Sequence, residues 1–169
     1  MKELLTDKIY TKTGDKGTTS DYLGKIYSKS DIEIELVGSI DEVNANIGHL
    51  RSKLQGRKYP IEVVPYVEDL LKEIQYHLYL IGVEFATDFT EIHITEDEVE
   101  YLEKSIDYMV NQIEPMTSFI YYSGSEPATF THVIRTITRR TERVFVRALK
   151  TKAYPQSYLY INRLSDLLF

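Results

Sequence analysis

Apolar side chains recur every three or four residues through nearly all of this chain beyond residue 29. The first series comprises Leu36, Ile40, Val43, Ile47, Leu50 and Leu54, which is the spacing of a helix-bundle seam. Similar series predict helices at about 63–85, 95–115, 127–148 and 158–169. Because short links join five amphipathic helices, we predict an all-α fold, a ferritin-like, up-and-down antiparallel bundle of five helices.

Capping sequences mark two of the helix starts. Ser30 with Glu33, and Thr95 with Glu98, have the spacing of a capping box, in which each side chain bonds the other residue's backbone N–H. The apolar alternation over 32–36 could instead form a short strand, and we rank that alternative lower. The segments 10–29 and 115–126 fit no helix, so we expect irregular structure there, where functional residues usually collect.

The composition limits the classes of protein that remain. The 169 residues are enough for one domain, 1–169, and they include no cysteine, which excludes thiol catalysis, thiolate zinc sites and a disulfide framework. The first residues, MKELLTDKIY, contain no apolar run that resembles a signal peptide or a membrane span. We therefore expect a cytoplasmic protein that does not bind a membrane.

The charge is unevenly distributed along the chain. The net charge is −6, yet residues 8–29 carry five lysines against two aspartates. Residues 132–150 carry six basic side chains against one glutamate. Two basic islands in an acidic protein favour a small polyanion that is bound locally, whereas a nucleic-acid-binding protein needs a broad basic surface.

The second basic island belongs to the stretch 119–143, FIYYSGSEPATFTHVIRTITRRTER, in which a glycine turn leads into a helix. The charged residues of this helix are Arg135, Arg139, Arg140 and Arg143 around Glu142. At about 100° per residue, one face of the helix collects His132, Arg135, Arg139 and Glu142. Guanidinium groups one turn apart suit a polyphosphate or a charged subunit interface, and a solvated helix face is the alternative.

The first basic island contains the segment YTKTGDKGTTSDYLGK, residues 10–25, with three glycines, four threonines, a serine and three lysines. Glycines let backbone N–H groups turn toward an anion, hydroxyl groups add donors, and lysines add charge. The spacing is not that of a Walker A loop. By composition, a phosphate-binding loop and a flexible, solvated loop are equally well supported.

Other polar positions carry weaker signals. Asp41 lies on a polar face beside the first seam, where it is either solvated or paired with an arginine. Asn162 lies on the outward face of the last predicted helix. The chain has neither the Glu-x-x-His pairs of a dimetal site nor a Ser-His-Asp arrangement, so it lacks the parts of a di-iron protein or a hydrolase.

Four segments, taken in order, resemble the PduO-type ATP:cob(I)alamin adenosyltransferases. They are Tyr10 to Ser20, Gly38 to Asn44 (GSIDEVN), the arginine helix, and Asn162 to Phe169 (NRLSDLLF). One turn departs from the family pattern, because residues 121–124 read Tyr-Tyr-Ser-Gly where Leu-Pro-Gly-Gly is usual. The resemblance implies a homotrimer of five-helix bundles, each with an irregular N-terminal nucleotide-binding loop, and ATP and corrinoid bound between neighbouring subunits.

The same resemblance implies roles for individual residues. Its ATP-binding loop comprises Thr11, Lys12, Thr13, Gly14, Asp15, Lys16, Gly17 and Thr18, joined by Lys29. It implies that Arg135, Arg139 and Glu142 bind ATP and its Mg²⁺, with Glu142 as the metal ligand. It also implies that Asn162 binds the nucleotide. The implied catalytic set is Arg135, Arg139, Phe119 and Asp41. Asp41 would pair with Arg135 across the subunit boundary, and Phe119 would lie beneath the corrin ring.

The implied activity transfers the 5′-deoxyadenosyl group from ATP to cob(I)alamin, giving adenosylcobalamin and triphosphate. Because the reduced cobalt is itself the nucleophile, the protein supplies charge for the leaving group and no nucleophile of its own. The implied partners are a reductase and an adenosylcobalamin-dependent enzyme. The alternatives are a non-enzymatic nucleotide- or corrinoid-binding helical bundle, and a structural bundle whose arginines only join subunits.

Overall fold

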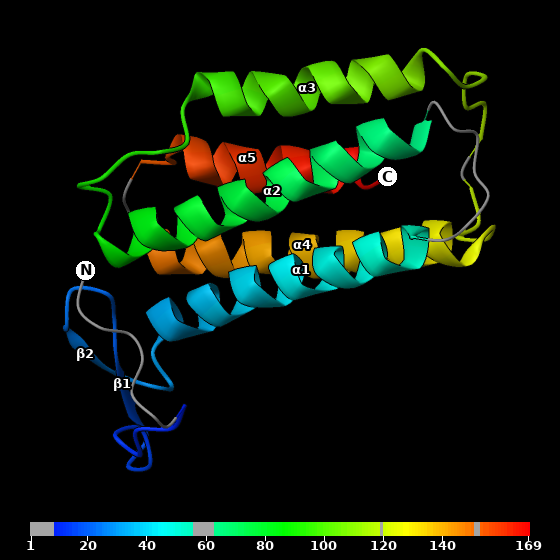
Figure 1. Ribbon diagram of the computed structural model, residues 1–169. Helices are drawn as coiled ribbons and strands as arrows, with labels where there is room; N and C mark the ends of the chain where they lie inside the picture. Colours follow the sequence, from blue (N-terminus) through cyan, green and yellow to red (C-terminus); the bar gives the residue numbers. More distant parts are fainter. Residues whose placement is uncertain (1–8, 56–62, 119, 151–152) are drawn as a thin grey trace.

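The computed structural model describes residues 9–55, 63–118, 120–150 and 153–169. Its helices are α1 (Ile32–Leu54), α2 (Val63–Ala86), α3 (Glu96–Val110), α4 (Glu126–Leu149) and α5 (Gln156–Leu167). Successive helices run in opposite directions (Figure 1). Helix α1 packs against α2 and α4, and α5 packs against α3 and α4. The predicted all-α, five-helix antiparallel bundle is confirmed.

The seam residues form the core because they line one side of each helix. On α1, the buried residues are Leu36, Ile40, Val43, Ile47 and Leu50, whereas Leu54 is only partly buried. The other helices contribute Leu70, Leu71, Ile74, Leu78, Ile81, Val99, Leu102, Ile134, Val144, Phe145, Tyr160, Ile161 and Leu164. Each such side chain stabilises the fold by about 1.5–3 kcal/mol when fully buried. The seam is therefore the main source of stability.

The start of α3 follows the predicted capping box. Thr95 is the N-cap, and the Glu98 carboxylate accepts a hydrogen bond of 2.7 Å from the Thr95 backbone N–H. The helix ends at Val110, however, and not near Pro115. Residues 111–118 are exposed, so no burial supports further helical turns there.

The start of α1 differs from the prediction. The N-cap is Asp31, not Ser30, and its side chain makes no cap hydrogen bond. The Asp31 carboxylate instead accepts a bond of 2.8 Å from the Ser28 backbone N–H, which ties the helix start to the preceding strand. The predicted Ser30–Glu33 box is therefore wrong, and the Glu33 carboxylate bonds a lysine after α4. Residues 32–36 are helical and not a strand.

The N-terminal segment is more regular than predicted. It forms an antiparallel hairpin of β1 (Thr18–Ser20) and β2 (Ile26–Ser28), in which Thr19 faces Tyr27. The turn between the strands is held by the Asp21 carboxylate, which accepts from the Leu23 and Lys25 backbone N–H groups at 2.9 and 2.8 Å. These local bonds stabilise a hairpin whose strands are only three residues long.

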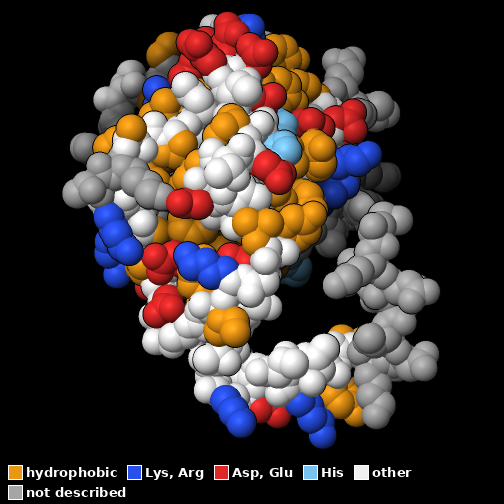
Figure 2. All heavy atoms as spheres, turned by 90° about the vertical axis from the view of Figure 1, so that its left-hand side faces the viewer, with side chains coloured by type: hydrophobic (Ala, Val, Ile, Leu, Met, Phe, Trp, Pro, Cys, Tyr) orange, Lys and Arg blue, Asp and Glu red, His pale blue; other side chains and the backbone are white. Residues whose placement is uncertain are grey.

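The hairpin and the loop before it extend beyond one end of the bundle, where α1 begins and α4 ends (Figure 1). Viewed from that end, they form an arm with basic side chains at its far edge and open space between it and the bundle (Figure 2). None of the described helices has the length and apolar character needed to cross a membrane.

Candidate functional site

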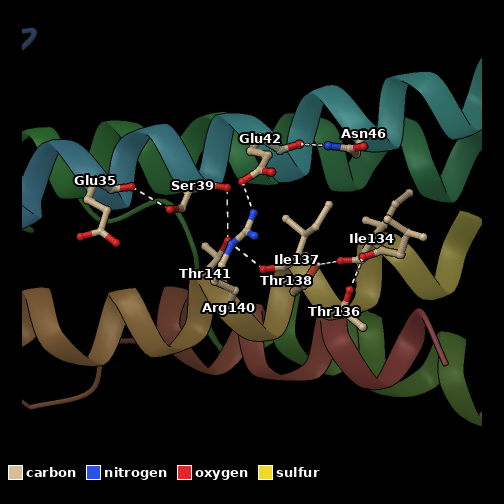
Figure 3. Close-up of polar contacts among 11 residues, drawn as sticks. Glu35, Ser39, Glu42, Asn46, Ile134, Thr136, Ile137, Thr138, Arg140 and Thr141 are labelled. Atoms are coloured by element: carbon tan, nitrogen blue, oxygen red, sulfur yellow. Dashed lines mark hydrogen bonds and ion pairs between the residues drawn. The ribbon is translucent and has the colours of Figure 1, made fainter.

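The basic residues of α4 divide into two groups, and the first group faces α1. Arg140 forms an ion pair with Glu42, as Figure 3 shows, and the hydroxyl of the neighbouring Thr141 donates to the Ser39 carbonyl at 3.2 Å. Two further pairs continue this ladder toward the end of the helix, Arg147–Glu35 at 3.0 Å and Lys150–Glu33 at 3.3 Å. Arg140 therefore belongs to a helix–helix contact and not to the predicted anion site.

The second group is a stripe formed by Arg135, Arg139 and Arg143, which follow at four-residue steps and so share one side of α4. Within the described part of the chain, none of the three forms an ion pair with a carboxylate. The Arg143 guanidinium donates to the Arg139 carbonyl at 2.8 Å. The stripe therefore keeps its positive charge available for an anion, which is the property that the sequence predicted.

Glu142 connects the stripe to α5. Its Oε1 atom accepts hydrogen bonds from the Asn162 side-chain amide at 2.9 Å and from the Tyr158 hydroxyl at 3.3 Å. Burial raises the pKa of Tyr158, with a further contribution from Glu142, so this hydroxyl stays protonated and donates. The structure thus brings together Glu142 and Asn162, two of the predicted site residues. Tyr158 was not predicted, although its four-residue step from Asn162 gives both the same helix face.

The arrangement of Glu142 fits the role of a magnesium ligand. Both of its described hydrogen bonds go to Oε1, and no described group bonds Oε2. Mg²⁺ prefers oxygen ligands and is usually held by one or two carboxylates together with substrate phosphates. No group of three or more His, Asp or Glu side chains suited to a metal lies together among the described residues. One carboxylate beside an arginine stripe suits a cation that arrives with a nucleotide.

Aromatic rings surround Arg135 at the start of the stripe. Its guanidinium lies 4.9 Å from the centroid of the Tyr122 ring and 5.7 Å from that of Phe169. The His132 ring lies against both, with centroid distances of 4.7 Å to Tyr122 and 6.0 Å to Phe169. Burial lowers the pKa of His132, and Arg135 lowers it further, so His132 is neutral at neutral pH. Tyr122, in the turn before α4, and Phe169, after α5, were not predicted as site residues, because the sequence does not show that their rings pack against Arg135.

The predicted ATP loop consists of two successive turns. The Asp15 backbone N–H donates to the Lys12 carbonyl at 3.3 Å, and the Gly17 N–H donates to the Gly14 carbonyl at 3.2 Å. Gly17 has φ +80°, a conformation that disfavours residues with a Cβ. Lys29 lies over Gly14, since a Cβ added there would be 2.9 Å from the Lys29 Nζ atom. The structure therefore places Lys29 with the loop, as predicted.

The remaining loop residues face solvent. Thr11, Lys12, Thr13, Asp15, Lys16, Gly17 and Thr18 are exposed, and Gly14 is half-buried. The hydroxyls of Thr11 and Thr13 are hydrogen-bonded to each other at 2.8 Å. Such a loop presents its lysines and hydroxyls outward, where a ligand or another subunit can reach them.

The loop and the arginine stripe do not meet within one chain. The loop lies beyond the end of α4, whereas Arg135 is about 20 Å before Leu149 along the helix axis at a rise of about 1.5 Å per residue. Asp41 is exposed on α1 and has no described partner, so the predicted pairing with Arg135 is absent within the chain. Phe119 lies outside the described residues.

A large apolar cavity lies at the other end of the bundle, where α3 and α5 end and α4 begins. Its volume is about 620 Å³, and it is lined by Ile106, Met109, Val110, Ile113, Met116, Ile120, Ala128, Thr131, His132, Asp166, Leu167, Leu168 and Phe169. Several of the lining side chains are more than half exposed, among them Val110 (56%), Ile113 (61%) and Met116 (57%). Clustered exposed apolar side chains of this kind mark a ligand or partner surface.

These features define a class of protein, a helical bundle whose arginine stripe has no carboxylate partner among the described residues and lies near a large apolar cavity. Comparison with known proteins gives the family. The family model for cobalamin adenosyltransferases matches residues 9–169, and the chain belongs to this family. The predicted resemblance is confirmed.

Several relatives are similar over nearly the whole chain. A corrinoid adenosyltransferase of Bacillus subtilis is 38% identical, with 96% of this chain and 83% of the relative covered. The corrinoid adenosyltransferase PduO of Salmonella typhimurium is 35% identical over 95% of this chain, which spans 47% of that longer protein. Among solved structures, a variant PduO-type ATP:corrinoid adenosyltransferase from Lactobacillus reuteri, complexed with cobalamin and ATP, has a TM-score of 0.84 and 32% identity. The match covers 96% of this chain and 87% of that one.

Proposed function

We propose that this protein transfers the 5′-deoxyadenosyl group of ATP to cob(I)alamin. The observation that carries the proposal is the stripe of Arg135, Arg139 and Arg143, which has no carboxylate partners among the described residues and lies beside Glu142 and Asn162. In the reaction, Co(I) attacks the C5′ atom of ATP, a Co–C bond forms, and the C5′–O bond breaks with its electron pair leaving on triphosphate. Developing negative charge on the leaving group is what a preorganised row of guanidiniums stabilises.

The geometry supports the individual roles that we assign. Arg135 and Arg139 bind the phosphate chain, and Glu142, whose Oε2 atom has no described partner, would hold Mg²⁺. Asn162 orients Glu142 through the 2.9 Å hydrogen bond and contacts the nucleotide. The loop from Thr11 to Thr18, with Lys29 over Gly14, supplies lysine and backbone donors to ATP.

The active site lies between subunits. The loop extends away from its own bundle, and about 20 Å of α4 separates Arg135 from the helix end beside the loop. A loop from one subunit and a stripe from its neighbour complete the site in a homotrimer, in which Asp41 pairs with Arg135 of the adjacent chain. Asp41→Asn should weaken assembly or ATP affinity. Combined with Arg135→Ala, it should be less damaging than the sum of the two single changes, because the residues act as a pair.

The corrinoid occupies the 620 Å³ apolar cavity. An adjoining cavity of about 540 Å³ is lined by Ser118 and Ile120, the chain neighbours of Phe119. A phenyl group in this segment would keep the lower face of the cobalt free of water. We place the enzyme in the cytoplasm, supplied with reduced cobalt by a reductase and passing adenosylcobalamin to an enzyme that uses it.

The test compares two adjacent arginines of α4. Adenosylcobalamin formation from ATP and chemically reduced cob(I)alamin is followed by absorbance, and released triphosphate is quantified. Arg139→Ala should lower kcat by about 10²–10³-fold, the usual loss for one leaving-group donor, with an unchanged melting temperature. Arg140→Ala is the matched control, because it removes only an exposed ion pair worth about 0–1 kcal/mol.

The outcome also separates the alternatives. Wild-type protein that binds ATP and cobalamin but forms no product would be a carrier. Protein that binds neither ligand would be a structural bundle, and equal losses in the two variants would remove Arg139 from the site.

A further inference from the structure

Arg135 differs from the other arginines in what holds its guanidinium. Four described arginines are held by carboxylates: Arg51 by Glu68, Arg140 by Glu42, Arg147 by Glu35 and Arg163 by Glu103. Arg135 instead lies over aromatic rings, at 4.9 Å from Tyr122 and 5.7 Å from Phe169. Within its own chain, Arg135 is thus oriented by aromatic faces, which leave its charge for groups from outside the chain, the proposed Asp41 of the adjacent subunit and the phosphates of ATP.

The polar atoms around this contact have unused bonding capacity. The Nε atom of Arg135 and the Nδ1 atom of His132 are buried, and neither has a hydrogen-bond partner among the described residues. No described group accepts a hydrogen bond from the Arg135 guanidinium, so its N–H groups remain able to donate to an anion. The aromatic contact therefore holds Arg135 without occupying its donors.

The ring of Tyr122 comes from the turn before α4, where residues 121–124 are Tyr-Tyr-Ser-Gly. The two tyrosines are also in different surroundings: Tyr121 is 93% exposed and has no described ring contact, whereas Tyr122 contacts both His132 and Arg135.

We infer that Tyr122 is a positioning residue that preorganises Arg135 for the phosphate chain of ATP. The inference rests on the proposed function, because it gives Arg135 its ligand. With Tyr122 in place, the guanidinium does not have to be ordered when ATP binds. Immobilising one long side chain costs affinity, and a cation–π contact offsets that cost before the ligand arrives.

The experiment measures ATP binding by isothermal titration calorimetry and steady-state kinetics for Tyr122→Leu, Tyr122→Phe and the matched control Tyr121→Leu. Tyr122→Leu should raise both the Kd and the KM for ATP about 3–10-fold, the range that corresponds to ordering one side chain. Its kcat should change by less than about twofold, since uniform ATP binding is what is lost. Tyr122→Phe retains the ring and should behave as wild type, as should Tyr121→Leu.

A double-mutant cycle tests whether Tyr122 acts through Arg135. In an Arg135→Gln background the side chain has no positive charge for the ring to attract, so adding Tyr122→Leu should change ATP affinity no further. Tyr122 is 59% exposed, so Tyr122→Leu should fold, and melting curves check this. If that variant does not fold, Tyr122→Ser carries the same expectation.

Two results would overturn the inference: ATP affinities that are equal in Tyr122→Leu and Tyr121→Leu, or an effect of Tyr122→Leu that persists undiminished beside Arg135→Gln. Failure of the proposed function looks different, because wild-type protein would then form no adenosylcobalamin, whether or not it binds ATP.

Discussion

Replacing Gly17 by alanine tests whether the N-terminal loop binds ATP. Gly17 has φ +80°, and a Cβ built there would meet no atom within 4 Å. The substitution therefore adds backbone strain without a steric clash. A residue with a Cβ in this left-handed region costs about 1–2 kcal/mol.

That strain sets the size of the expected effect. The Gly17 N–H bonds the Gly14 carbonyl, and the Gly17 carbonyl accepts from the Lys29 N–H at 2.9 Å, so relaxing φ at Gly17 displaces both turns of the loop. If the loop has to return to the strained conformation to bind ATP, the cost appears in affinity. A penalty of 1–2 kcal/mol corresponds to a rise of about 5–30-fold in the KM for ATP. The melting temperature should hardly change, because the loop lies outside the core.

Gly24 is the matched control. It has φ +83° and also has no atom within 4 Å of an added Cβ, but it lies in the turn between β1 and β2. Gly24→Ala therefore carries the same strain at a position outside the proposed contact, and its KM for ATP should stay within about twofold of wild type. Gly82 lies in the middle of α2 and also has no atom within 4 Å of an added Cβ, so Gly82→Ala controls for the added methyl group alone. Equal rises in KM for Gly17→Ala and Gly24→Ala would refute the assignment of residues 11–18 to the nucleotide.

Three further predictions concern magnesium, stability and pH. Glu142→Gln should raise the Mg²⁺ concentration needed for half-maximal activity, with the melting temperature unchanged, because the amide oxygen still accepts from Asn162. Tyr160→Phe should lower the free energy of unfolding by about 1–3 kcal/mol in urea titrations, because it leaves the buried His77 Nδ1 atom without its 3.0 Å partner. Burial lowers the pKa of His77 and of His132 below 6.5, so the unfolded chain binds protons at a higher pH than the native protein. The free energy of unfolding should therefore fall as pH drops from 6.5 toward the native pKa values, and His77→Gln should reduce this dependence without abolishing it.

The helical architecture could be predicted because a helix that buries one side has apolar residues at every third or fourth position of its sequence. The series from Leu36 to Leu50 predicted the buried face of α1, and the Thr95–Glu98 spacing predicted the start of α3. The predicted helix start at Ser30 is wrong because the neighbouring acidic side chains bond other groups, and the residue spacing does not show these partners. Asp31 binds the strand before it, and Glu33 binds Lys150, which directly follows α4.

The candidate site was predictable only where its residues share a helix. Arg135 and Arg139 lie one turn apart, so their common face follows from the sequence. The separation of Arg140 from them depends on Glu42 of α1, and the ring over Arg135 comes from the turn before α4. Such contacts depend on how elements pack, which no local pattern encodes.

The ion-pair ladder between α1 and α4 also determines how the two helices are aligned along their length. As residue numbers rise along α1 through Glu33, Glu35 and Glu42, their partners Lys150, Arg147 and Arg140 descend α4 in step. In these three pairs each acid is on α1 and each base is on α4 or directly follows it, whereas a fourth pair between the two helices, Lys53–Glu126 at 2.6 Å, has the opposite polarity. A slide of one turn would break the three pairs of the ladder at once. Although each pair is individually weak, together they select one register. Because α1 follows directly from the hairpin and α4 carries the arginines, that register also sets how far the proposed nucleotide loop of each chain stands from its own arginine stripe.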